Sequence, residues 1–79
     1  MVAIQNFSFN PPTLRIQKGG MVTWTNRDSI VHNAILNDGS GATPLLSTGQ
    51  SATLRFENTG SFSYRCGPHP WMTGTIVVE

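Results

Sequence analysis

The chain has 79 residues and a formal net charge of +1, from five basic and four acidic side chains. This length accommodates one domain, which we place at residues 1–79 and which can bury only a modest core. Charged residues make up 11% of the sequence, against roughly 25% in a typical globular domain, and the scattered basic residues argue against a nucleic-acid-binding surface.

Alternation of polar and apolar residues recurs along the chain and predicts β-strands. The stretches Val22–Thr25 and Phe62–Cys66 each place every second side chain on one face, as in a half-buried strand. No segment carries apolar residues at helical spacing over a useful length. Turn-forming residues separate the predicted strands. These strands are 2–9, 13–18, 21–26, 31–36, 51–57, 61–66 and 73–79.

Seven short strands at this spacing predict an all-β fold, an antiparallel Greek-key β-sandwich or barrel. The longest irregular stretch is 37–50, to which the sequence assigns no role. No apolar run approaches the roughly 20 residues of a membrane span, so none is predicted. No signal peptide precedes the first strand, which fits either a cytoplasmic protein or a mature exported protein with an added Met.

The single cysteine, Cys66, directs attention to the loop that follows the sixth predicted strand. Without a second cysteine it forms no intramolecular disulfide, and it is a buried apolar residue, a reactive thiol or a metal ligand. The loop places His69 and Met72 three and six residues after Cys66. The only other histidine is His32, on a predicted strand.

These four side chains form the donor set of a blue-copper site. Sulfur ligands are soft and favour Cu(I), whereas imidazole also suits Cu(II), and two His and one Cys with a weak axial Met is the known blue-copper arrangement. Zinc prefers sets from Cys₄ to Cys₂His₂ and rarely takes Met, so a structural zinc site is a weaker alternative. We therefore predict one copper ion, cycling between Cu(II) and Cu(I), bound by His32, Cys66, His69 and Met72.

Residues beside these ligands are expected to hold them in place. Pro68 and Pro70 each fix one φ angle of the loop and lack an N–H group. Asn33 directly follows His32, and its side chain can tie the His32 strand to the Cys66 loop at Gly67. Trp71 either packs the loop on the end of the sandwich or forms, with Pro68 and Pro70, an exposed apolar patch for a redox partner.

The sequence resembles the plastocyanin-like cupredoxins, and its ligand loop is most similar to that of the amicyanins. Two features depart from that pattern: Gly67 stands where the family usually has Ser or Thr, and the stretch between His32 and the sixth predicted strand is short. The resemblance rests on Asn10–Pro12, Val22–Asn26, His32-Asn33, Tyr64–Cys66, Cys66–Met72, Gly74 and Val77–Glu79.

The resemblance implies a non-enzymatic electron carrier with a mononuclear copper site. It implies a Greek-key sandwich, His32, Cys66, His69 and Met72 as ligands, and a redox protein as donor and another as acceptor. It also implies a periplasmic or other extracytoplasmic location, and a carrier of this kind is expected to be a monomer. The alternative function is a copper carrier or store without redox turnover, which would require ready exchange of the metal.

Overall fold

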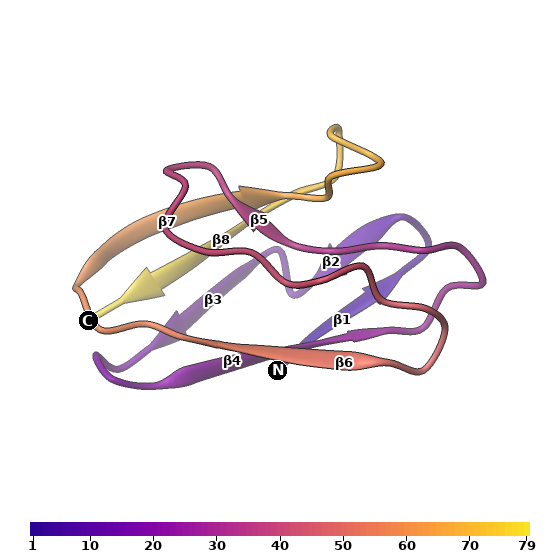
Figure 1. Ribbon diagram of the computed structural model, residues 1–79. Helices are drawn as coiled ribbons and strands as arrows, with labels where there is room; N and C mark the ends of the chain where they lie inside the picture. The colour runs from indigo at the N-terminus through magenta and orange to yellow at the C-terminus, as the bar shows by residue number, and fades with distance from the viewer.

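The computed structural model describes residues 1–79 and forms two four-stranded sheets packed face to face (Figure 1). One sheet has the strand order β2-β1-β4-β6, and the other has the order β3-β8-β7-β5. The strands are β1 (Val2–Gln5), β2 (Ser8–Asn10), β3 (Thr13–Ile16), β4 (Met21–Asn26), β5 (Ile35–Leu36), β6 (Ser51–Arg55), β7 (Gly60–Arg65) and β8 (Thr73–Val78). The structure contains no helix of the length and hydropathy needed to cross a membrane.

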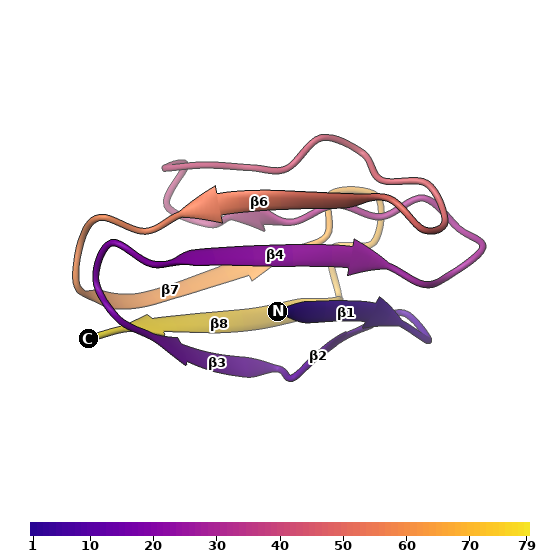
Figure 2. The same cartoon turned by 90° about the horizontal axis from the view of Figure 1, so that it is seen from below.

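The all-β sandwich expected from the sequence is confirmed, but its sheets are mixed rather than wholly antiparallel. Strand β1 runs parallel to β4, with Val2 opposite Trp24, and β3 runs parallel to β8, with Leu14 opposite Ile76. Figure 2 shows β1 and β4 side by side with their arrows in the same direction. Alternation in a sequence reveals which face of a strand is buried, but it does not reveal the direction of the neighbouring strand.

The first predicted strand, 2–9, is divided into β1 and β2 by a tight turn. Gln5 pairs with Ser8, and the two residues between them, Asn6 and Phe7, both have φ of 54°. Two-residue hairpins of this kind need positive φ at both central positions, which Asn-Gly usually supplies. The bulky Phe7 in the second position concealed the turn from a reading of the sequence.

The fourth predicted strand is shorter than expected, because only residues 35–36 pair regularly with β7. His32 precedes β5 and forms an isolated bridge to Leu46, and Ile35 forms another to Ala42. The irregular stretch 37–50 therefore returns alongside the segment that carries His32. Backbone hydrogen bonds join the two, with Leu46 N donating to His32 O over 2.7 Å.

The core lies between the sheets and is filled by the inward face of each strand. Trp24 from one sheet meets Tyr64 from the other edge to face, with ring centroids 5.3 Å apart. Gly74 on β8 leaves room for the Tyr64 ring, since a Cβ there would lie 2.5 Å from the phenol oxygen. This packing fixes β7 and β8, and the loop between these two strands is the one that carries three of the expected ligands.

Candidate metal centre

The loop 66–72 joins β7 to β8 and projects from one end of the sandwich (Figure 1). It is closed by backbone hydrogen bonds, from Cys66 N to Met72 O at 3.1 Å and from Met72 N to His69 O at 2.9 Å. Cys66 and Met72 turn inward and are 0% and 3% exposed, whereas His69 is half-buried. The compact loop thus presents an imidazole, a thiol and a thioether from seven successive residues.

His32 reaches this loop from the segment before β5, and its side chain is fully buried. Two hydrogen bonds join its backbone to that of Leu46: the N–H of Leu46 donates to His32 O, and the carbonyl of Leu46 accepts from His32 N. Asn26, at the end of β4, donates from its side chain to Leu46 O at 2.7 Å and to Ile30 O at 2.8 Å. A buried amide that satisfies two carbonyls in this way fixes the backbone on either side of His32.

The donor atoms of three residues converge at one point. The Sγ atom of Cys66 lies 3.6 Å from Nδ1 of His32 and 3.7 Å from Nδ1 of His69. These donor atoms all lie within 4.8 Å of one another. Bonds of about 2.3 Å to sulfur and about 2.0 Å to nitrogen allow the two donors of one ion to lie up to about 4.3 Å apart, and both sulfur–nitrogen separations are shorter than that. The spacing of the side chains would therefore allow one first-row metal ion to be held by all three.

The chemistry of the donor set favours copper over zinc at this position. The side chain of Met72 is buried within the core cluster. Its backbone is joined to the backbones of Cys66 and His69, in the same loop, by hydrogen bonds. A thioether beside a thiolate and two imidazoles is a soft set that suits copper in both oxidation states. Structural zinc sites are instead built from Cys and His.

Asp28 is a residue of the site that sequence reasoning missed. Its Oδ2 atom lies 2.9 Å from His32 Nε2, the ring nitrogen that faces away from the sulfur. With Nδ1 directed to the metal position, Nε2–H donates to this carboxylate, which fixes the tautomer and the ring orientation. The only signal in the sequence was an acidic residue four positions before a histidine, and outside a helix that spacing carries no structural meaning.

The charge on Asp28 is stabilised by its hydrogen bonds. Burial acts to raise the pKa of this carboxyl, but hydrogen bonds from the backbone N–H groups of Phe7 and Asn6 and from His32 outweigh burial and lower it. The carboxylate is therefore ionised at neutral pH and remains an acceptor for His32.

The residues expected to hold the ligands have these positions. Asn33 is buried, and its Oδ1 accepts a hydrogen bond of 2.7 Å from the backbone N–H of Gly67, which joins the His32 segment to the Cys66 loop. A Cβ on Gly67 would lie 3.1 Å from that oxygen, so glycine makes this close approach easier. Pro68 and Pro70 are exposed on the loop.

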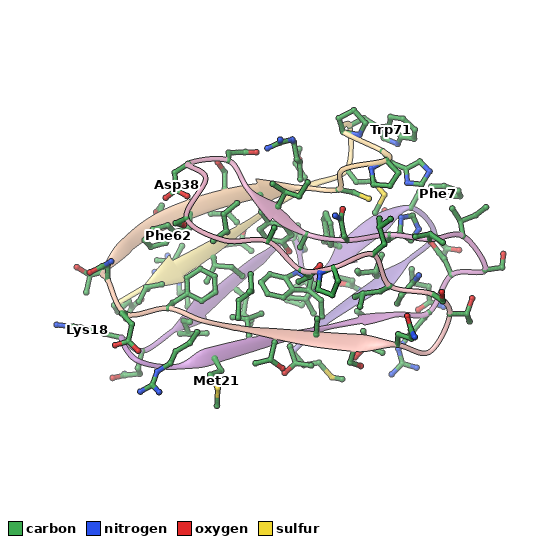
Figure 3. All side chains as sticks on the ribbon, in the orientation of Figure 1. Phe7, Lys18, Met21, Asp38, Phe62 and Trp71 are labelled. Atoms are coloured by element: carbon green, nitrogen blue, oxygen red, sulfur yellow. The ribbon has the colours of Figure 1, made fainter.

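Trp71 is 68% exposed and packs edge-on against His69, with ring centroids 5.2 Å apart. Figure 3 places Trp71 and Phe7 at the same end of the molecule and Lys18 at the opposite end. The tryptophan ring thus lies on the surface beside one of the expected ligands.

Comparison with known proteins assigns this fold and site to a family. The profile of the copper binding proteins of the plastocyanin/azurin family matches residues 1–79. The chain therefore belongs to this family of copper-binding β-sandwich proteins, the cupredoxins.

Within the family, the similar proteins include amicyanins. The chain is 37% identical over 83 residues to amicyanin-alpha of Methylorubrum extorquens, covering 99% of this chain and 70% of that protein. It is 33% identical over 84 residues to amicyanin of Paracoccus denitrificans, covering 100% and 64%. A reduced Cu(I) form of an amicyanin variant superimposes with a TM-score of 0.91 at 35% identity, covering 99% of this chain and 79% of that one. The ligand loop is accordingly of the amicyanin type.

Proposed function

We propose that the protein is a type 1 copper electron-transfer protein that passes single electrons between redox partners. Copper, cycling between Cu(II) and Cu(I), would be held by His32, Cys66, His69 and Met72. One observation supports this most strongly: the Cys66 sulfur lies 3.6 and 3.7 Å from two imidazole nitrogens in a chain of a copper-binding family.

Bound copper would supply the one-electron chemistry at this position. The protein's part is to hold the donors in a geometry that both oxidation states accept. His32 is fixed by Asp28 and Leu46, and the Cys66 loop is tied to the neighbouring segment by the hydrogen bond from Gly67 N–H to Asn33. Because these supports are already in place, little of the structure has to rearrange when an electron arrives or leaves.

Burial of the donors favours an electron carrier over a protein that hands copper on. His32 and Cys66 are 0% exposed and Met72 is 3% exposed, so an incoming acceptor protein cannot reach these side chains to exchange ligands. Only His69 is part-exposed. This imidazole edge is where an electron could pass at short range while the copper stays in the protein.

The surface around His69 suits docking of a redox protein. Trp71 lies beside Pro68 and Pro70, and five of the seven exposed large hydrophobic side chains come from segments that carry or flank the site. Apolar patches of this kind form the centre of transient interfaces. The five side chains are Phe7, Ile30, Val31, Leu45 and Trp71.

The remaining features of the proposal follow from its relatives and from the size of the chain. Residues 1–79 form a single domain that works as a monomer, with one redox protein as electron donor and another as acceptor. The protein acts outside the cytoplasm, in a periplasmic compartment. The proposed role is that of an electron carrier without enzymatic turnover, and both histidines of the chain are used at the one proposed site.

The test is to add Cu(II) to the purified metal-free protein and record its visible spectrum. We expect an intense band from thiolate-to-copper charge transfer, and its complete loss in Cys66→Ser. Reversible reduction and reoxidation of the band, followed in a spectroelectrochemical cell, would separate the electron carrier from a copper store. A folded, copper-loaded protein without the band would overturn the proposed site, and a band that reduces irreversibly would favour copper storage.

A further inference from the structure

The turn between β1 and β2 adopts a conformation that its residues do not prefer. Asn6 and Phe7 both have φ of 54°, in the left-handed region. Asparagine tolerates this region, but for a bulky residue such as phenylalanine it is an outlier that persists only when the surroundings impose it. Glycine would form the same turn without strain, so the phenylalanine side chain must contribute something that glycine cannot.

The turn is held by two hydrogen bonds to the side chain of Asp28. The N–H of Asn6 donates to Oδ1 of Asp28 at 2.7 Å, and the N–H of Phe7 donates to Oδ2 at 2.9 Å. Hydrogen bonds to an ionised carboxylate are about twice as strong as neutral ones. The same Oδ2 atom lies 2.9 Å from His32 Nε2. One carboxylate therefore connects the strained turn to a ligand.

The Phe7 ring is held against both imidazoles. Its centroid lies 5.3 Å from that of His32 and 5.2 Å from that of His69, with interplanar angles of 90° and 87°. Edge-to-face contact is one of the two preferred arrangements of aromatic rings. The outer part of the ring is in solvent, since Phe7 is 43% exposed, while His32 beneath it is 0% exposed.

We propose that the Asn6–Phe7 turn is a cover over the metal centre, held closed by Asp28, and that Phe7 positions both imidazoles and excludes water from His32. The inference rests on the proposed copper site. In this arrangement the strained backbone places the phenylalanine ring against both imidazoles. A relaxed turn with a smaller residue would open the His32 ring to solvent and leave both imidazoles free to reorient.

The first test compares Phe7→Leu with the matched change Phe62→Leu. Phe62 packs on Phe56, with ring centroids 5.6 Å apart, at the end of the sandwich away from Phe7 (Figure 3). Each Cu(II)-loaded protein is mixed with excess EDTA, and the decay of the visible band gives the rate of metal release. We expect release about tenfold faster or more in Phe7→Leu, rescue by Phe7→Tyr, and the wild-type rate in Phe62→Leu. Release from Phe7→Leu at the wild-type rate would overturn the cover.

A second variant and a metal-free readout keep the test decisive if Phe7→Leu folds poorly. Phe7→Asn accepts left-handed φ and so retains the turn while removing the ring. In the metal-free protein, NMR measures how fast the Nε2–H proton of His32 exchanges with water. We expect faster exchange in Phe7→Asn than in wild type, and equal exchange would overturn the inference. If wild type shows no charge-transfer band, the proposed function fails, and this measurement still decides on the cover.

Discussion

Tyr64 brings a phenol into the centre of the core without a hydrogen-bond partner for its oxygen. The side chain is 0% exposed, and its ring packs edge-on against Trp24 and Phe9. Because the phenolate cannot be solvated there, burial raises the pKa of Tyr64 to about 12. Tyr64 therefore fills the core, but ionisation of its buried phenol disfavours the folded state, and this effect on stability can be measured.

The alkaline stability of the metal-free protein should depend on Tyr64. The unfolded chain releases the phenol proton near the ordinary pKa of 10.0, and the folded chain near 12, so stability is intact below 10 and falls as pH rises towards 12. The loss at the end of that range is about 2 to 3 kcal/mol. Urea unfolding at a series of pH values, in wild type and in Tyr64→Phe, measures it. We expect the difference between the two proteins to change over this window; parallel curves would contradict the assignment.

Gly74 should be intolerant of any side chain, because its place on β8 lies against the Tyr64 ring. A Cβ there would lie 2.5 Å from the phenol oxygen, and the buried ring is packed against Trp24 and Phe9. Gly74→Ala is expected to lower the free energy of unfolding by about 1 to 3 kcal/mol. Gly41→Ala is the control, since a Cβ at Gly41 makes only ordinary contacts, the nearest at 3.5 Å. Equal effects of the two changes in denaturant titrations would refute the steric argument.

At the scale of elements, the irregular segment 37–50 supports the segment that carries His32. Thr43 accepts the backbone N–H of Ala34 on its Oγ1 at 3.0 Å and donates its own N–H to Ala34 O at 2.8 Å. Leu46 forms the corresponding pair with His32. A stretch without regular secondary structure thus acts as a partial strand beside the site.

Removing the Thr43 hydroxyl should therefore weaken the frame around His32. Thr43→Val keeps the shape but leaves the buried Ala34 N–H unpaired, which is expected to cost about 1 to 3 kcal/mol of stability. Thr53→Val removes an exposed hydroxyl that pairs with Thr23 at 2.8 Å, and its effect should stay within about 0.5 kcal/mol. Thermal unfolding of the metal-free proteins makes the comparison. If Thr43→Val is as stable as wild type, the segment 37–50 covers the site without supporting it.

The sequence allowed the strands and the approach of His69 to Cys66 to be anticipated, because both depend on local spacing. It did not reveal Asp28 or Phe7, whose contacts with His32 arise only when β1, β2 and β4 meet in three dimensions. The sequence did not reveal the direction of neighbouring strands either. Side-chain alternation is the same in parallel and antiparallel pairs.

For the whole molecule, small size makes bound metal a large part of the total stability. A domain of 79 residues is marginally stable, and a ligand that binds only the folded chain adds stability by mass action. At free copper a thousandfold above its dissociation constant, the gain is about 4 kcal/mol. For a domain of this size, that gain corresponds to a rise in Tm of about 15 to 30 °C.

Calorimetry with and without Cu(II) tests this expectation, and Cys66→Ser is the control in which the rise should vanish. A wild-type Tm that is insensitive to Cu(II) would show that the donors do not bind the metal in the folded state. A rise that persists in Cys66→Ser would place the stabilising metal elsewhere on the chain.

The hairpin formed by β7 and β8 also determines when the metal centre can come into being. Its loop holds three of the four proposed ligands, while His32 comes much earlier in the chain. Strand β8 is also the only partner of β3 and the partner of β7, and it thus joins an early part of the chain to a late one. While β8 is still inside the ribosome, the nascent chain has neither a closed loop 66–72 nor a complete second sheet. A complete metal centre therefore requires that the chain has been synthesised through β8.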